Sequence, residues 1–181
     1  MSKLVEKKIS SQTVYKGNFL DVKKDNVVLP NGKNSTREWI NHPGAVVIVP
    51  ILPNGKIALI RQFRYAMGSE FIELPAGKID KGETPDECAI RELEEEIGFK
   101  TKNLNFIAMI HPAIGFANEN MSLYLATDLV QTNINRDSDE FLELMPTSLE
   151  HALDLVWSNK ITDVKTIIGI LWYQKIYQEG K

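Results

Sequence analysis

The sequence predicts an α/β fold in which a mixed β-sheet lies between helices, with an antiparallel sheet near the N-terminus. Three patterns predict it. Residues 12–40 contain strand-like runs separated by turn residues. Residues 45–52, AVVIVPIL, form a nearly unbroken apolar run, as expected of a buried strand. Residues 85–97 carry the start and stop signals of a helix.

Composition and charge indicate ordinary globular material. The chain has 181 residues, 43% of them hydrophobic and 25% charged, which suffices for a sizeable core. Its formal net charge of -3 offers no basic surface for extended nucleic-acid binding. The single cysteine, Cys88, excludes an intrachain disulfide and is expected to pack inside a helix. The first residues lack the apolar core of a signal peptide and no run approaches membrane-spanning length, so we expect a cytoplasmic protein without membrane contact.

The N-terminal region, residues 1–43, is predicted to be rich in strands. Its first 11 residues are polar, and Pro30-Asn31-Gly32 separates the last two strand-like runs. Asn-Gly between such runs is a strong hairpin signal. The aromatic side chains here, Trp39 among them, are by composition more often sheet packing than ligand contacts.

The next stretch is predicted to hold two strands joined as a hairpin. Pro53-Asn54-Gly55 follows the apolar run and precedes a second strand over residues 56–63. Pro50 has no amide hydrogen to donate, which predicts a sheet edge or a bulge at that residue. Arg61 and Arg64 lie at the end of the second strand, where they are either solvated charge or a clamp for phosphate.

The helix over residues 85–97 has signals at both ends. Thr84 is the N-cap residue, Pro85 occupies the first helical position, and Glu87 completes a capping box. Gly98 supplies the left-handed residue that ends the helix. At helical spacing, three apolar side chains share one face of the helix: Ile90, Leu93 and Ile97. Three glutamates lie on roughly the opposite face: Glu92, Glu95 and Glu96.

Four glutamates within five residues, Glu92 and 94–96, need a counter-charge because like charges at helical spacing repel. Arg91 can offset Glu87 or Glu95 at four-residue spacing, but one arginine cannot neutralise the group. The group is therefore either a solvated acidic face or a site for a hard cation such as Mg²⁺ or Mn²⁺.

The rest of the chain alternates strands and helices. Strands are predicted over residues 104–110 and 121–130, with a loop between them, and over residues 141–145. Thr147 and Glu150 are expected to open a helix over residues 149–157. A C-terminal helix over residues 162–178 is expected to pack on the sheet through its apolar side chains, Ile167, Ile168, Leu171 and Ile176.

The spacing from Gly77 to Phe99 resembles the Nudix box, GX5EX7REUXEEXGU with U apolar. Every defined position matches: Gly77, Glu83, Arg91, Glu92, Leu93, Glu95, Glu96, Gly98 and Phe99. The resemblance implies a Nudix-type α/β/α sandwich over residues 44–181. It also implies a metal-dependent hydrolase that acts on a nucleoside diphosphate linked to another moiety.

Further runs, at residues 37–51, 59–80, 139–144 and 161–170, are similar in order and kind to the ADP-ribose pyrophosphatase branch of the family. This implies Mg²⁺-dependent cleavage of ADP-ribose, or a related nucleoside diphosphate sugar, to a nucleoside monophosphate and a sugar phosphate. The branch is typically a homodimer in which the N-terminal sheet, here within residues 1–43, reaches the active site of the partner.

Carried over by position, the resemblance also implies functional residues. Two or three Mg²⁺ ions, or Mn²⁺, would be held by Glu92, Glu95, Glu96 and the carbonyl of Ala76. The implied general base is Glu140, with Glu119 as its rival, and Glu95 and Glu96 complete the catalytic set. The implied substrate contacts are Arg37, Trp39, Arg64, Glu73, Gly77 and Glu119.

Two alternatives stay open. The same chemistry could act on GDP-sugars, dinucleoside polyphosphates or nucleoside triphosphates, because the box recognises the diphosphate and not the groups attached to it. Residues 111–119, HPAIGFANE, also depart from the Ser-Pro-Gly-Phe run that relatives commonly carry, which leaves the sugar open. The other class is a nucleotide-sensing Nudix domain without catalysis, although such domains usually have an eroded box.

Overall fold

The computed structural model describes residues 3–132 and 141–180. The chain forms two compact units. The first unit comprises Met1–Gly44 with Ala113–Glu119, and the second comprises Ala45–Pro112 with Asn120–Lys181.

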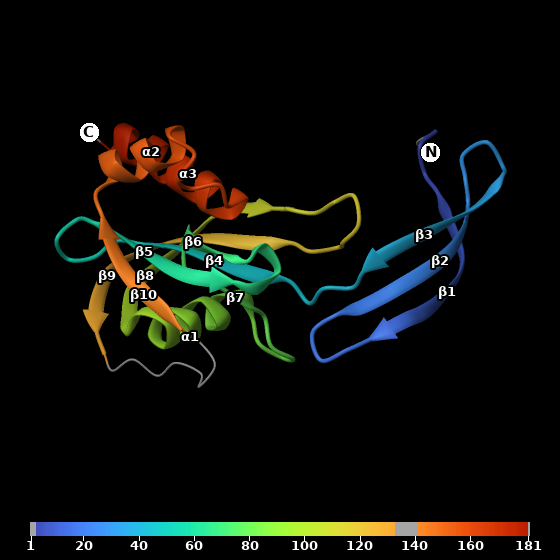
Figure 1. Ribbon diagram of the computed structural model, residues 1–181, viewed down its shortest axis with the longest axis horizontal. Coiled ribbons are helices and arrows are strands. Elements are labelled where there is room, and N and C mark those ends of the chain that lie inside the picture. Colours follow the sequence, from blue (N-terminus) through green and yellow to red (C-terminus); the bar gives the residue numbers. More distant parts are fainter. Residues whose placement is uncertain (1–2, 133–140, 181) are drawn as a thin grey trace. The chain divides into compact units, whose positions relative to one another are not determined.

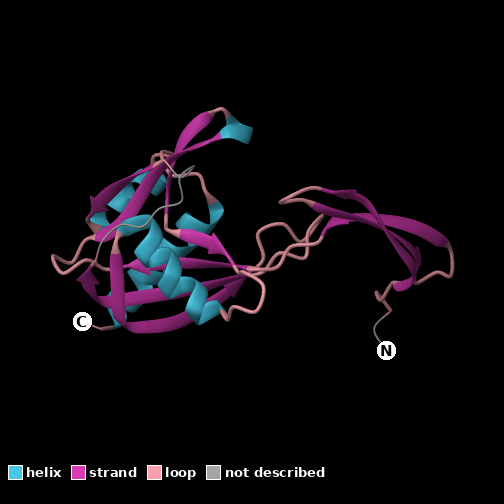
Figure 2. Ribbon diagram, turned by 90° about the horizontal axis from the view of Figure 1, so that it is seen from below, coloured by secondary structure: helices cyan, strands magenta, loops and turns pink. Residues whose placement is uncertain are grey.

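The first unit is built on a three-stranded antiparallel sheet in the order β1 (Lys7–Lys16), β2 (Asp21–Val28) and β3 (Asn34–Ile40) (Figure 1). Its described residues contain no helix (Figure 2). Gly32, with φ of 83°, donates its amide hydrogen to the carbonyl of Leu29, which confirms the predicted turn. β1 begins earlier than predicted. All ten of its residues are exposed, so an apolar alternation was not needed to form it.

Residues 113–119 belong to the first unit because they bond to the end of β3. The amide of Ile40 donates to the carbonyl of Phe116 at 2.8 Å, and the amide of Asn118 donates to the carbonyl of Ile40 at 3.2 Å. The amide of His42 also donates to Asn118 Oδ1, at 2.7 Å. Hydrogen bonds therefore link the two segments of this unit that hold candidate site residues, namely the end of β3 and residues 113–119.

The second unit contains two sheets. One is mixed, in the order β7 (Ala76–Lys78), β4 (Ala45–Pro50), β9 (Met121–Gln131) and β8 (Phe99–Ile110), with β4 parallel to β9. The other is antiparallel, in the order β10 (Leu142–Thr147), β5 (Ile57–Arg64) and β6 (Ser69–Glu73). A short 3₁₀ helix, η1 (Tyr65–Met67), connects β5 to β6.

Helices cover both faces of these strands (Figure 1). The side chains of β4 alternate between two cores. Val46 and Ile48 pack with α1 (Pro85–Ile97), whereas Val47 and Val49 pack with α2 (Leu149–Trp157) and α3 (Val164–Glu179). All of β4 is therefore buried. The α/β/α sandwich with a mixed sheet, and the antiparallel N-terminal sheet, are as predicted.

The predicted hairpin after β4 is wrong beyond its turn. The turn forms, with the amide of Gly55 donating to the carbonyl of Leu52 at 2.8 Å. Pairing of the two strands ends at a single bridge between Ile51 and Ile57. β4 already has β7 and β9 as neighbours, so β5 pairs with β10 and β6 instead.

Pro50 is tolerated in a central strand because its neighbour on one side is short. β7 pairs only with Ala45–Val47. The amide of Ile48 points to that side, toward the carbonyl of Pro75, while the amide of Ile51 points to β9. By alternation, the missing amide hydrogen of Pro50 faces the side where β7 has ended, so the strand is locally an edge, as predicted.

The ends of α1 are as predicted. Thr84 Oγ1 accepts from the amide of Glu87 at 3.3 Å, and Glu87 Oε2 accepts from the amide of Thr84 at 2.8 Å. Gly98, with φ of 72°, ends the helix. The predicted core position of Ile90 is wrong, since it is 41% exposed and Cys88 and Ala89 are buried instead.

The other two helices differ in detail from the prediction. The N-cap of α2 is Ser148, and not Thr147, which is the last residue of β10. Thr166, Gly169 and Ile170 are among the fully buried residues of α3. Ile167 and Ile168 are partly buried and pack against the same core, as predicted. A Cβ atom on Gly169 would lie 2.3 Å from Leu74 Cδ1, which shows how closely this helix approaches the chain after β6.

Candidate active site

The box brings α1 against β7 at a glycine. A Cβ atom on Gly77 would lie 1.7 Å from Glu92 Oε1, so only glycine leaves room for that carboxylate. One helical turn later, Glu96 Oε2 accepts a hydrogen bond from the amide of Ala76 at 3.2 Å. Glycine is therefore required at position 77 because it has no side chain, and not because the backbone adopts an unusual φ angle.

Glu92 and Glu96 lie on the buried side of α1. They are 7% and 4% exposed, respectively, whereas the sequence predicted that both lie opposite the apolar face. The reason is that β7 and the residues before it cover this side of the helix, and that a backbone amide is available to Glu96. Buried carboxylates require such partners or a cation.

Arg91 holds three of the carboxylates of the box. Its Nε donates to Glu83 Oε1 at 2.8 Å, and its Nη1 donates to Glu92 Oε1 at 2.7 Å and to Glu95 Oε2 at 2.8 Å. The expected pairing with Glu95 is therefore present, while Glu87 is engaged in the capping box. We call Glu83, Arg91, Glu92, Glu95 and Glu96 the acid cluster.

The charges of the acid cluster perturb one another. Hydrogen bonds from Arg91 lower the pKa of Glu83 to about 2, more than burial raises it. The same bonds raise the pKa of the Arg91 guanidinium. The acid cluster itself holds four carboxylates and one guanidinium, so it carries an excess of negative charge that favours a bound cation.

Glu73, at the end of β6, forms the centre of a second group. Arg64 Nε donates to Glu73 Oε1 and Arg64 Nη2 to Glu73 Oε2, each at 2.7 Å. Lys165 Nζ also donates to Glu73 Oε2, and it donates to Asp163 Oδ2 at 2.8 Å. We call Arg64, Glu73, Asp163 and Lys165 the Glu73 cluster.

Opposing effects act on the pKa values in the Glu73 cluster. Burial raises the pKa of Glu73, but the hydrogen bonds and charges of Arg64 and Lys165 outweigh it, so the pKa is lowered. Hydrogen bonding to Glu73 raises the pKa of Arg64, and the charge of Glu96 adds to this. The guanidinium of Arg64 therefore interacts electrostatically with carboxylates of both clusters.

Sequence reasoning did not identify Lys165 or Asp163. A signal was nevertheless present, because Lys165 lies in the first turn of α3, where the helix dipole disfavours a positive charge. Asp163, the N-cap residue, and Glu73 compensate for this. Arg64 and Glu73 were predicted as separate substrate contacts, and the structure shows them bonded to each other.

The remaining candidates lie elsewhere in the chain. Arg37 and Trp39 are two residues apart on β3, hence on one face of the first unit's sheet, and Arg37 forms an ion pair with Glu6. In the same unit, Glu119 Oε1 lies 3.7 Å from His42 Nε2. Glu140 lies outside the described residues.

The donor set of the acid cluster suits a hard divalent cation. Its four glutamates offer carboxylate oxygens, and the carbonyl of Ala76 belongs to the residue whose amide donates to Glu96. Within residues 3–132 and 141–180, no three His, Cys, Asp or Glu side chains are already grouped as ligands. Arg91 occupies Glu92 and Glu95, so these carboxylates would exchange the guanidinium for a cation.

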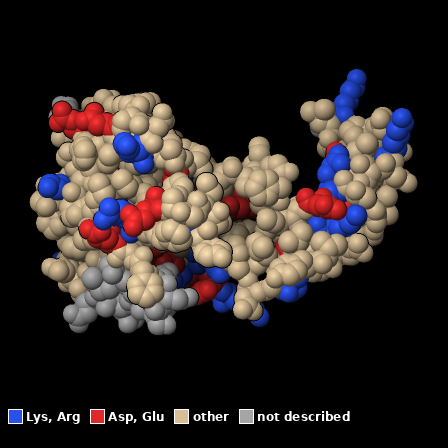
Figure 3. All heavy atoms as spheres, in the orientation of Figure 1, with Lys and Arg blue, Asp and Glu red and all other residues tan. Residues whose placement is uncertain are grey.

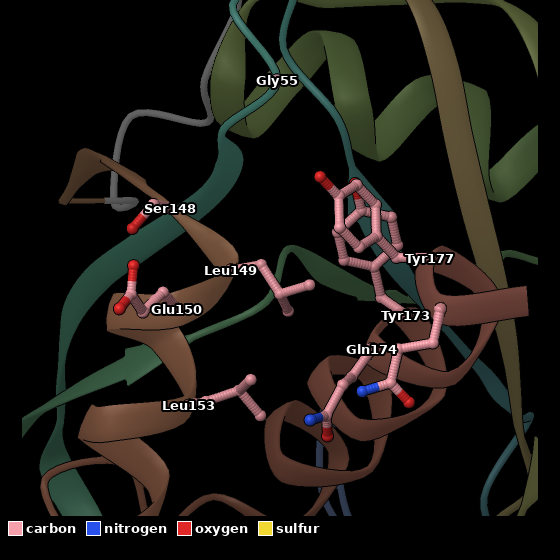
Figure 4. Close-up of a pocket in the computed structure, with 9 residues that line it drawn as sticks. Gly55, Ser148, Leu149, Glu150, Leu153, Tyr173, Gln174 and Tyr177 are labelled. Atoms are coloured by element: carbon pink, nitrogen blue, oxygen red, sulfur yellow. The ribbon is translucent and has the colours of Figure 1, made fainter. Parts of the chain in front are cut away.

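A cavity of about 520 Å³ lies between α2 and α3 (Figure 4), and no residue of either cluster lines it. Leu149 and Leu153 form part of its apolar wall, and Tyr173 and Tyr177 border it from α3. None of the candidate residues lines this cavity. It is not part of the site.

Two surface properties complete the description. On the face of the second unit shown in Figure 3, acidic and basic side chains are interspersed. In the described part of the chain, no helix is both long and apolar enough to cross a membrane.

Comparisons with known proteins agree with the box geometry. Residues 41–164 match the NUDIX domain, and residues 6–40 match the nucleoside diphosphate sugar hydrolase N-terminal domain. The chain is 42% identical over 176 residues to the ADP-ribose pyrophosphatase of Bacillus subtilis (strain 168), covering 96% of this chain and 95% of the relative. It is 37% identical over 177 residues to the methanol dehydrogenase activator of Bacillus methanolicus, covering 96% of each.

A solved structure shares both the fold and the chain length. The crystal structure of an ADP compounds hydrolase matches with a TM-score of 0.89 and 25% identity, covering 99% of this chain and 98% of that one. The predicted resemblance is thereby confirmed. The chain belongs to the Nudix hydrolase family and carries the N-terminal domain of the nucleoside diphosphate sugar hydrolases.

Proposed function

We propose that this enzyme hydrolyses the diphosphate of ADP-ribose, or of a related nucleoside diphosphate sugar, to AMP (or another nucleoside monophosphate) and a sugar phosphate. One observation carries the proposal. The acid cluster and the Glu73 cluster meet along residues 73–77, so a site for cations adjoins an arginine that is suited to phosphate. The relatives named ADP-ribose pyrophosphatase and ADP compounds hydrolase support the substrate class.

The proposed metal ligands are the carboxylates of Glu92, Glu95 and Glu96 and the carbonyl of Ala76. Two or three Mg²⁺ ions, or Mn²⁺, would neutralise the diphosphate and lower the pKa of the attacking water. Two backbone features position the proposed ligands before a cation binds. Gly77 leaves space for Glu92, and the amide of Ala76 orients Glu96.

The proposed substrate contacts serve the diphosphate, the base and the polar ends of the substrate. Arg64 would donate to phosphate oxygens with its planar guanidinium, beside Glu73. Trp39 would stack on the base, and Arg37 and Glu119 would contact the polar ends of the substrate. Trp39, Arg37 and Glu119 belong to the first unit.

The proposed general base is Glu140. It would accept a proton from the water that attacks phosphorus, while the bond between phosphorus and the bridging oxygen breaks. Glu140→Gln should lower kcat by a factor of about 10²–10⁴ and leave the Mg²⁺ dependence unchanged. Glu119→Gln is the matched comparison. Wild-type turnover in Glu140→Gln, together with a loss in Glu119→Gln, would transfer the role to Glu119.

We further propose a cytoplasmic homodimer in which the first unit of one copy completes the site of the other. The support is that β1 exposes its full length, including the apolar side chains of Ile9 and Val14. Light scattering should give twice the chain mass of 20.5 kDa. A truncation that starts at Ala45 should be monomeric with greatly raised KM, and an active monomer would contradict the dimer.

The substrate class is tested with a panel. ADP-ribose, GDP-mannose, UDP-glucose, diadenosine polyphosphates and nucleoside triphosphates would each be incubated with Mg²⁺, and the products identified. We expect preference for ADP-ribose, with AMP and ribose 5-phosphate as products. Preference for another compound would retain the Nudix chemistry and change the substrate. Binding without turnover of any compound would favour the nucleotide-sensing alternative.

A further inference from the structure

The carboxylate of Glu73 is bound by two cations that differ in exposure. Its own side chain is 3% exposed, and that of Lys165 is 10% exposed, whereas that of Arg64 is 45% exposed. Lys165 reaches Glu73 from the start of α3, and Arg64 reaches it from the end of β5. One cation is therefore fixed in the interior and the other can reach solvent.

Lys165 is held in place by more than Glu73. Its ammonium group donates to Asp163 Oδ2 at 2.8 Å, and Asp163 Oδ2 also accepts from Thr166 Oγ1 at 2.5 Å. Thr166 Oγ1 in turn accepts from the amide of Leu74 at 2.8 Å, directly after Glu73. These bonds tie the start of α3 to the end of β6, so Lys165 has little freedom to leave Glu73.

Arg64 has no comparable attachment. In the described residues, the hydrogen bonds of its side chain go to Glu73, through Nε and Nη2. To bind an anion with these two donors, the guanidinium must turn away from Glu73. A buried carboxylate that loses its only partner is strongly destabilising, so such a movement needs a second counter-charge at Glu73.

We propose that Lys165 is the permanent counter-charge of Glu73, and that it allows Arg64 to turn from Glu73 to the diphosphate of the substrate. Lys165 is thus a positioning residue, which acts through Glu73 and Arg64 without touching the substrate. The inference rests on the proposed function only in taking a diphosphate as the anion that Arg64 binds.

The test is a double-mutant cycle between Lys165→Met and Glu73→Gln. With Glu73 charged, Lys165→Met leaves Arg64 as its only cation, so KM for ADP-ribose should rise at least about tenfold while kcat changes little. With Gln at position 73 there is no charge to compensate, so Lys165→Met should add almost nothing to KM. Equal effects of Lys165→Met in both backgrounds would overturn the proposal.

A merely structural role of Lys165 gives a different result. Lys165→Met would then lower the thermal midpoint and the active fraction, with KM unchanged, and this would overturn the proposal. Lys165→Arg keeps the charge and should keep KM near the wild-type value, while a rise like that of Lys165→Met would contradict us. The matched control is Lys175→Met, which removes an exposed ion pair with Glu179 from the same helix.

A binding measurement separates this inference from the proposed function. Inorganic pyrophosphate would be titrated calorimetrically, with EDTA present, into the wild type and the three variants of the cycle. Weaker binding in Lys165→Met only when Glu73 is present would support the inference even if ADP-ribose proved not to be a substrate. Equal pyrophosphate affinity for the wild type and Lys165→Met would overturn it even if ADP-ribose were hydrolysed.

Discussion

The acid cluster and the Glu73 cluster are built from the same types of residue, yet they differ in charge balance. In the acid cluster, one arginine pairs with Glu83, Glu92 and Glu95, and Glu96 accepts a hydrogen bond from the amide of Ala76. In the Glu73 cluster, Arg64 and Lys165 balance the carboxylates of Glu73 and Asp163. The first group has more carboxylates than cations, whereas the second presents a half-exposed cation. The contrast teaches that a buried carboxylate does not by itself indicate a cation site. The balance of charges around the carboxylate indicates whether the site will bind a cation or an anion.

The largest expected effect is that of Glu96→Gln on the acid cluster. Activity should fall at least about a hundredfold, because even residues that only support a metal ligand often cost 10–100-fold. Glutamine can still accept the bond from the amide of Ala76, so the thermal midpoint should stay close to that of the wild type. Hydrolysis rates over a range of Mg²⁺ concentrations provide the measurement. The control is Glu94→Gln, on the same helix, which removes an ion pair with Lys100 of β8. Equal rates for both variants would contradict the assignment.

Gly77→Ala should have the next largest effect, because the new methyl group would displace the carboxylate of Glu92. We expect roughly a tenfold or greater loss of kcat/KM and a higher Mg²⁺ concentration for half-maximal activity, with the fold retained. Circular dichroism and kinetics at several Mg²⁺ concentrations test this. Gly180→Ala is the matched control, because its Cβ atom would meet only an ordinary contact at 3.5 Å. Unchanged Mg²⁺ dependence in Gly77→Ala would remove Glu92 from the site.

Gly169→Ala tests the packing that supports the Glu73 cluster. The added methyl group would lie 2.3 Å from Leu74 Cδ1 and 3.2 Å from Val49 Cγ2. Overpacking typically costs about 1–3 kcal/mol, and the gain in helix propensity offsets about 1 kcal/mol of it. Urea denaturation should therefore show a net loss of about 1 kcal/mol in the free energy of unfolding, with Gln174→Ala as a control on the same helix. A stabilised Gly169→Ala variant would show that the space beside Leu74 is not tight.

The smallest expected effect concerns acid stability. The pKa of Glu83 is lowered from 4.5 to about 2 in the folded protein, mainly by its hydrogen bonds from Arg91. Its contribution to stability is therefore complete above pH 4.5 and is lost as the pH falls toward 2. Glu83→Gln should lose less stability than the wild type between pH 6 and pH 3, measured by denaturant unfolding. The exposed-pair variant Glu179→Gln should follow the wild type, and a slope for Glu83→Gln as steep as that of the wild type would contradict the prediction.

Features that depend on a few adjacent residues could be predicted from the sequence. Thr84, Glu87 and Gly98 determine both ends of α1 through bonds within the helix and its caps, and the structure has these ends as predicted. The burial of β4 and the turn at Gly32 are likewise local in origin. The fold class follows from such elements and their order.

Features that depend on distant partners could not be predicted in the same way. Lys165 and Glu73 are 92 positions apart, and nothing near either residue specifies the other. β5 looked like the partner of β4, but its neighbours β10 and β6 were decided by the pairing of the whole unit. Glu92 and Glu96 were assigned to the face opposite the core because the approach of β7 to α1 is a tertiary contact.

The most direct test of the division between the two clusters compares Glu92→Gln with Arg64→Gln. For each variant, the Mg²⁺ concentration for half-maximal activity and KM for ADP-ribose at saturating Mg²⁺ would be measured. We predict that Glu92→Gln raises the Mg²⁺ requirement with little change in KM, and that Arg64→Gln raises KM with little change in the Mg²⁺ requirement. If both variants raised both quantities to the same extent, the two clusters would not divide metal binding from diphosphate binding.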